Sequence, residues 1–152
     1  MWVYRICKMK ERTRDLSGTG ASLYGGRWNS EGTFMLYTSL SPALSMLEML
    51  AHADEFDVPP QMYLSKIRVS DESPIYEFPE AELPFDWRES NNFELKKIGD
   101  QLMAKKEYLG IKVLSAVFSV EWNLLLNPLF PGYTDLVRVE SIQSLDTDSR
   151  LL

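Results

Sequence analysis

Residues 17–50 read SGTGASLYGGRWNSEGTFMLYTSLSPALSMLEML, a glycine-rich segment followed by a predicted strand and a predicted helix. The glycines let the backbone turn tightly or be approached closely, and Arg27 directly follows Gly25 and Gly26. Glu48 lies further along, on the predicted helix. A guanidinium and a carboxylate beside a glycine-shaped pocket can hold a phosphate and stabilise a sugar cation. We therefore interpret the chain as an enzyme.

The strand and helix of this stretch follow from its apolar pattern. Residues 33–38 favour a strand, and the Ser41-Pro42 pair is typical of a helix N-terminus. We expect the helix to continue to about residue 53, which places Glu48 on the flank of its apolar face. A boundary glutamate paired with a lysine is the alternative reading of Glu48.

Two residues are expected to act on the Glu48 carboxylate. Contact with Arg27 would keep it ionised at neutral pH. His52 stands one helical turn further on, close enough for a hydrogen bond that would orient the carboxylate. Both also have ordinary readings, a surface salt bridge for Arg27 and a structural histidine for His52.

The glycines at positions 18 to 26 invite comparison with the GxGxxG motif of dinucleotide-binding folds. That motif follows a buried strand and opens a helix, whereas the charged residues 8–15 precede these glycines. We expect a glycine loop that forms an anion cradle with Arg27. A plain turn is the alternative.

Working outward, periodicity predicts further strands and one further helix. The expected strands are Trp2–Cys7, Gln61–Val69 and residues 75–78, 111–120 and 136–139, and the expected helix covers residues 92 to about 108. Strands outnumber helices and do not alternate with them regularly, so we expect an α+β fold with a compact, mostly antiparallel sheet. One domain, residues 1–152, suits a chain of this length.

Composition excludes several classes of function. The formal net charge of -6 argues against direct binding to a nucleic-acid backbone. One cysteine and one histidine cannot supply a Cys/His metal site, and a lone cysteine suits a reducing compartment. No apolar run approaches the roughly 20 residues of a membrane span. We expect a soluble, cytoplasmic protein.

Two further residues attract attention. Tyr37 ends the predicted strand and either packs in the core or forms a stacking wall. Ser115 interrupts the most apolar strand, where its hydroxyl needs a partner, and the polar Glu121 and Asn123 follow before a turn. We find no Ser-His-acid spacing, so Ser115 is not expected to be a nucleophile.

Together these residues resemble the RES domain, the toxin half of Xre–RES toxin–antitoxin pairs. The motifs that carry the resemblance are Tyr4-Arg5, GGRWN at 25–29, LExLxH at 47–52, Gly99-Asp100, SAV at 115–117, Asn123 and Asn127-Pro128. Leu102, Leu114 and Phe130 depart from the family's pattern, and we expect them to be packing changes.

The resemblance implies a domain similar to ADP-ribosyltransferases, with NAD as substrate and no cofactor. It implies cleavage of the nicotinamide–ribose bond by water or inorganic phosphate, or transfer of ADP-ribose to a protein. It also implies a partner, an Xre-type helix-turn-helix antitoxin that caps the site and forms an oligomer with the toxin. The site residues that it implies are Arg5 and Arg27 for the phosphates, Tyr37 for stacking, Glu48 for the ribose, Ser115 for the ligand or Glu48, and His52 and Asn123 for ligand binding. A non-catalytic module that binds a nucleotide or a partner is the competing class.

Overall fold

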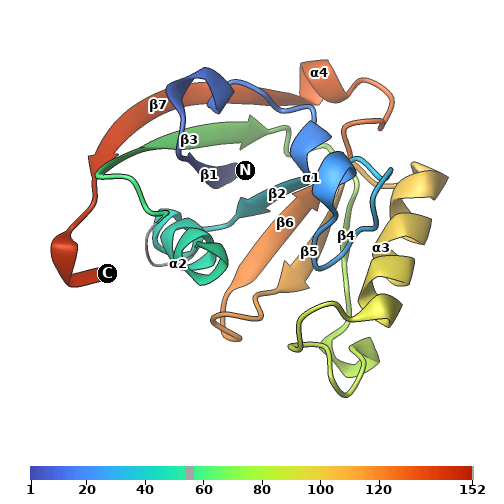
Figure 1. Ribbon diagram of the computed structural model, residues 1–152. Coiled ribbons are helices and arrows are strands. Elements are labelled where there is room, and N and C mark those ends of the chain that lie inside the picture. Colours follow the sequence, from blue (N-terminus) through green and yellow to red (C-terminus); the bar gives the residue numbers. More distant parts are fainter. Residues whose placement is uncertain (54–56, 152) are drawn as a thin grey trace.

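The computed structural model describes residues 1–53 and 57–151 and contains a seven-stranded sheet in the order β4-β5-β6-β2-β1-β3-β7 (Figure 1). Only β4 and β5 pair in parallel, while all other neighbours in this described sheet are antiparallel. The strands are β1 (Trp2–Cys7), β2 (Leu36–Ser39), β3 (Gln61–Val69), β4 (Ile75–Glu77), β5 (Gly110–Leu114), β6 (Trp122–Leu126) and β7 (Val137–Asp146). The expected α+β class with a mostly antiparallel sheet is confirmed.

Helices lie around this sheet. They are α1 (Thr19–Tyr24), α2 (Pro42–His52), α3 (Phe93–Lys105) and the short α4 (Tyr133–Leu136), with single 3-10 turns at Lys10–Arg12, Glu80–Glu82 and Ser149–Leu151. In the view of Figure 1, strands β2, β6 and β5 lie between α2 and α3. No helix in the described part of the chain combines the length and the apolar run that a membrane crossing requires.

Buried apolar clusters lie on both faces of the sheet, because successive residues of a strand point to opposite faces. On β6, Leu124 and Leu126 belong to one cluster and Leu125 to the other. The residues that depart from the family's pattern pack here: Phe130 lies against the first cluster, Leu102 lies against the second, and Leu114 is buried.

Side-chain N-caps explain why the two long helices, α2 and α3, begin where they do. The Ser41 hydroxyl accepts the Leu44 amide at 3.1 Å, with Pro42 next in the chain, and the side-chain Oδ1 of Asn92 accepts the Leu95 amide at 3.1 Å. The predicted helix after Ser41 is confirmed, and the predicted one from residue 92 ends at Lys105 rather than 108.

The strand expected over residues 111–120 is wrong, because β5 ends at Leu114 and the chain returns as β6. The Ser115 hydroxyl accepts the amides of Val117 and Phe118 at 3.1 and 3.0 Å, which turns the chain away from the sheet. The Ser115 amide then donates to the Glu121 carbonyl at 3.0 Å and closes the hairpin. A serine that seemed to interrupt one strand therefore joins two.

Three other expectations need correction. The glycine segment is not a loop throughout, since Gly18 and Gly25, at φ +69° and +72°, bracket the helix α1. The last strand is longer than residues 136–139, because β7 pairs with β3 along its whole length. The second strand is shorter than residues 33–38 suggested, since β2 begins at Leu36.

Candidate active site

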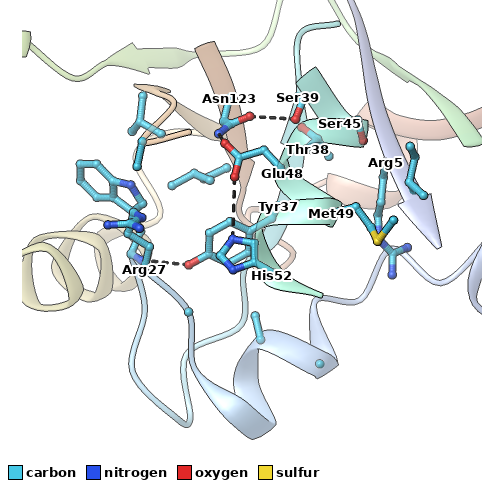
Figure 2. A pocket seen from close by; sticks show the side chains of 18 of the residues that line it. Arg5, Arg27, Tyr37, Thr38, Ser39, Ser45, Glu48, Met49, His52 and Asn123 are labelled. Atoms are coloured by element: carbon cyan, nitrogen blue, oxygen red, sulfur yellow. Dashed lines mark hydrogen bonds and ion pairs between the residues drawn. The ribbon is translucent and has the colours of Figure 1, made fainter. Parts of the chain in front are cut away.

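A pocket of about 470 Å3 is lined by residues from β1, α1, β2, α2, β5, β6 and the loop after α1. This volume lies within the roughly 300–1,000 Å3 usual for small-molecule sites. Figure 2 shows Glu48 between Asn123 and His52, with Arg27 and Arg5 on either side in that view. The predicted site residues that line the pocket are Arg5, Arg27, Tyr37, Glu48, His52 and Asn123.

The Glu48 carboxylate is held from α2 by donors on the β5–β6 hairpin. Its Oε1 accepts the Ser115 hydroxyl at 2.7 Å and the Asn123 amide nitrogen at 2.6 Å. The Ser39 hydroxyl donates to Asn123 Oδ1 at 2.8 Å, which fixes the orientation of that amide. With its side chain 22% exposed, Glu48 keeps Oε2 outside these two hydrogen bonds. The carboxylate is therefore fixed in place but still open to the pocket.

Ser115 has no exposed surface and is not among the residues that line the pocket. Its hydroxyl donates to Glu48 while accepting the two amides of the hairpin turn. Of the two contacts expected for Ser115, the structure contains the one to Glu48. Ser115 is thus a positioning residue that links the hairpin to the carboxylate.

His52 lies one turn from Glu48, as expected, but no hydrogen bond joins the two side chains. Its Nε2 is 3.7 Å from Glu48 Oε2, which exceeds hydrogen-bond length, and its side chain is 69% exposed. The expected orienting hydrogen bond is therefore wrong. The contact becomes an ion pair when the imidazole is protonated.

Arg27 lines the pocket but does not contact Glu48, so the contact predicted between them is wrong. Its Nη1 donates to the backbone carbonyls of Trp87 at 2.9 Å and Glu89 at 3.0 Å, and no ion pair is formed with Glu48 within residues 1–53 and 57–151. The guanidinium connects the loop after α1 to the segment before α3.

The loop that carries Arg27 is held by α3, whose residues lie about seventy positions later in the chain. Lys96 Nζ donates to the carbonyls of Gly26 at 2.6 Å and Asn29 at 3.3 Å, and Asp100 Oδ1 accepts the Ser30 amide at 2.9 Å. At Gly99, an added Cβ would lie only 1.7 Å from the Trp28 carbonyl oxygen. Nothing in the sequence pattern around Lys96 indicated this role.

Tyr37 is a pocket wall whose hydroxyl fixes the same loop. It accepts the Trp28 amide at 3.0 Å and donates to Asn29 Oδ1 at 2.7 Å. Burial raises the pKa of the hydroxyl well above its ordinary value, so it stays a donor at neutral pH. The residue combines the two readings left open by the sequence, since its ring packs against a buried cluster and also lines the cavity.

Arg5 lies on β1, and its Nη1 donates to the carbonyls of Arg12 at 3.2 Å and Asp15 at 2.8 Å. Arg12 also lines the pocket, although the sequence placed it only within a charged connector. Three guanidinium groups, those of Arg5, Arg12 and Arg27, thus line a pocket that also contains one fixed carboxylate. Such a site suits a ligand that carries both anionic groups and a centre that becomes positive.

Comparison with known proteins gives consistent matches along the chain. The RES domain family model matches residues 3–148. A protein named Toxin Res from Yersinia enterocolitica is 30% identical over 152 residues, covering 99% of both chains. The Prs ADP-ribosylating toxin of a Sphingobium species is 35% identical over 121 residues, covering 77% of this chain and 74% of that one.

A solved structure resembles the fold as a whole. The crystal structure of the M. tuberculosis MbcT–MbcA toxin–antitoxin complex contains a chain that matches with a TM-score of 0.71 at 20% identity, covering 99% of this chain and 85% of that one. At that identity the likeness concerns the fold alone. The family match and the similarity to the Yersinia protein span nearly the full sequence. The chain therefore belongs to the RES domain family, as a relative of the Res toxins.

Proposed function

We propose that this RES-family toxin cleaves the bond between nicotinamide and ribose in NAD, which is its substrate and not a resident cofactor. The observation that carries the proposal is the Glu48 carboxylate, fixed by Ser115 and Asn123 in the wall of a pocket that three arginines also line. A carboxylate and guanidinium groups in one cavity match a substrate that is anionic at its diphosphate and becomes cationic at its ribose.

The chemistry needs no group beyond these side chains and an acceptor. The C1′–N1 bond of the nicotinamide ribose breaks, its electron pair leaves with neutral nicotinamide, and positive charge develops on the ribose as in glycoside hydrolysis. Glu48 would stabilise that charge through Oε2, while Ser115 and Asn123 hold Oε1 still. The acceptor then forms a bond to C1′ and releases its proton to the solvent. Rate acceleration comes from orientation and from electrostatics arranged in advance.

Binding would use the arginines and the pocket walls. Arg5 and Arg27 would contact the diphosphate, and Arg27 could do so through Nε and Nη2 because Nη1 alone binds the carbonyls of Trp87 and Glu89. Tyr37 would stack in the nicotinamide pocket, and His52 and Asn123 would contact the ligand beside Glu48. All of these residues line the cavity.

The acceptor separates two candidate activities. Water or inorganic phosphate gives an NAD-degrading enzyme, which is our principal proposal. Transfer of ADP-ribose to a protein is the second candidate, and it is favoured by the similarity to the Prs ADP-ribosylating toxin of Sphingobium. Both activities begin with the same bond cleavage at Glu48.

We further propose that a helix-turn-helix antitoxin of the Xre type binds over this pocket in the cytoplasm and forms an oligomer with the chain. The similarity to the toxin–antitoxin complex of M. tuberculosis supports a partner of this kind. Large apolar side chains beside the site are exposed and would be covered in such a complex: Leu23 is 60% exposed, Tyr24 80% and Leu47 41%.

Incubation of the purified chain with NAD tests the proposal, with nicotinamide followed by chromatography and the other product identified by mass. ADP-ribose as product indicates water as the acceptor, ADP-ribose phosphate formed only in phosphate buffer indicates phosphorolysis, and ADP-ribose attached to protein indicates transfer. We expect Glu48→Gln to lower nicotinamide release by at least about 1,000-fold, with an unchanged circular dichroism spectrum. Full activity in the folded variant, or no nicotinamide from the unmodified chain, would refute the proposal.

A further inference from the structure

A second cavity, of about 140 Å3, adjoins the pocket that contains Glu48. The two cavities share the lining residues Arg5, Arg12, Gly20, Ala21 and Tyr37, whereas Glu48, His52 and Asn123 line only the larger one. A cavity of about 150 Å3 can hold one benzene ring, so the smaller cavity has room for a group of the size of a phosphate. A ligand in the larger pocket can therefore extend one small group into it.

The charged groups of the smaller cavity differ in how they are engaged. Arg5 uses Nη1 to bind two backbone carbonyls, which leaves its Nε and Nη2 donors for a ligand. The Arg12 guanidinium has neither an ion pair nor a hydrogen bond within residues 1–53 and 57–151, while its own carbonyl is held by Arg5. At Gly20, an added Cβ would lie 3.3 Å from Arg12 Nη2, so the guanidinium lies against the backbone of α1.

Asp15 is the negatively charged residue in the described lining of this cavity. Its Oδ1 accepts the Ser17 amide at 3.0 Å and the Ser17 hydroxyl at 2.5 Å. Hydrogen bonds from the Ser17 hydroxyl and then the Ser17 amide, and more weakly the charges of Arg5 and Arg12, lower the pKa of the Asp15 carboxyl, which is ionised at neutral pH. Among the described residues that line the cavity, two guanidinium groups face one carboxylate, which gives this lining a surplus of positive charge. The cavity thus favours an anion, and Asp15 limits how tightly it is held.

We propose that Arg12 and Arg5 form a phosphate subsite in the smaller cavity, a proposal that rests on the nucleotide-cleaving function above. Planar guanidinium groups bind tetrahedral phosphate through paired N–H donors, which gives the site its chemical class of ligand. Three sources share this chemistry: the diphosphate of NAD, the 2′-phosphate of NADP, and free inorganic phosphate. Because Glu48 does not line the cavity, the phosphate held there lies away from the bond that breaks.

Isothermal titration with three probes tests the subsite without any need for turnover. The probes are ADP, adenosine 2′,5′-bisphosphate and inorganic phosphate, and each represents one source. We expect at least one probe to bind Arg12→Gln at least about 10-fold more weakly, through the loss of a charge-assisted pair. The same probe should bind Asp15→Asn several-fold more tightly, because an asparagine oxygen still accepts the Ser17 donors but carries no charge.

The matched control is Arg14→Gln, which makes the same charge change two residues away at a position that lines neither cavity. Its affinities should equal those of the unmodified chain. Equal affinities of Arg12→Gln and the unmodified chain for all three probes, or no binding of any probe, would overturn the subsite. A chain that binds a probe through Arg12 but leaves NAD intact would keep the subsite and refute the proposed cleavage. A chain that consumes NAD but binds every probe equally well with and without Arg12 would keep the proposed cleavage and refute the subsite.

Discussion

Glu48 and Arg27 line one pocket, yet the contacts that hold them differ in kind. The Glu48 carboxylate is fixed by side chains, Ser115 and Asn123, which donate directly to it. The loop of Arg27 is fixed through its backbone, because Lys96 binds two of its carbonyls and α3 packs directly against it at Gly99. The first arrangement consists of hydrogen bonds between side chains, and the second of contacts to the loop backbone, made by the Lys96 side chain and by the close approach of α3 at Gly99. Substitutions around Glu48 should therefore affect mainly catalysis, whereas substitutions around the Arg27 loop should affect mainly stability and substrate binding.

Gly99→Ala should have the largest effect on stability. Its Cβ would lie 1.7 Å from the Trp28 carbonyl oxygen, so α3 must move away from the loop. We expect a loss of about 3 kcal/mol in the free energy of unfolding, the upper part of the range for overpacking. Urea unfolding measures it, with Gln101→Ala, at an exposed position of the same helix, as the control. Equal stability of the two variants would show that the close approach of α3 to the Arg27 loop is not required for the stability of the fold.

Ser115→Ala tests the carboxylate side and should act on catalysis more than on binding. It removes a hydrogen bond to Glu48, so we expect kcat for NAD to fall about 10- to 100-fold, the equivalent of a charged hydrogen bond, with a small change in KM. Ser119→Ala is the control, because Ser119 lies exposed in the same hairpin turn. A change in KM alone would mean that Ser115 acts on the shape of the substrate-binding pocket and not on Glu48.

Lys96→Met tests the loop side with a milder change. Two carbonyls of the loop, those of Gly26 and Asn29, would lose a charged donor. We expect a loss of about 1.5 kcal/mol in stability and a rise in KM of several-fold with kcat nearly kept, since Arg27 would be less well placed. Lys97→Met, at an exposed neighbouring position, is the control. A fall in kcat without a rise in KM would contradict the separation of roles between the two sides.

The difference between local side-chain patterns and long-range backbone contacts also explains what the sequence could and could not predict. Strands Trp2–Cys7 and Gln61–Val69 and the capped helix after Ser41 carry strong local patterns, and the structure contains each of them. The turn at Ser115 was missed, because a serine that accepts two backbone amides has the same sequence pattern as one that interrupts a strand.

Contacts to the Arg27 loop were harder to predict, since no local pattern reports backbone contacts between residues seventy positions apart. Resemblance to a family supplied the residue types of the pocket, but it did not reveal that the Arg27 guanidinium binds the carbonyls of Trp87 and Glu89. Arg12 was missed for a related reason. The pattern of the charged residues 8–15 does not indicate that Arg12, and not Arg14, lines a cavity.

Tyr37→Phe should have the smallest effect, and that effect should depend on pH. At pH 7 the variant leaves the Trp28 amide and Asn29 Oδ1 without their partner, at a cost of about 1 kcal/mol. In the unmodified chain, burial raises the pKa of Tyr37, and of Tyr133, above the value of about 10 for the unfolded state. Above pH 10 the unfolded chain releases these protons and the folded chain keeps them, so stability falls by about 1.4 kcal/mol per tyrosine for each pH unit.

The variant lacks the Tyr37 loss of about 1.4 kcal/mol by pH 11, which exceeds its own cost of about 1 kcal/mol at pH 7, so the stability gap between it and the unmodified chain should close and slightly reverse between pH 7 and pH 11. Urea unfolding at both pH values measures the gap, and Tyr24→Phe is the control because Tyr24 is 80% exposed. A gap that is the same at both pH values would mean that the Tyr37 proton is not retained by the folded state. In that case the hydroxyl would stop donating to Asn29 as the pH rises to 11, and the Arg27 loop would then depend on α3 and on the bonds from Arg27 to Trp87 and Glu89.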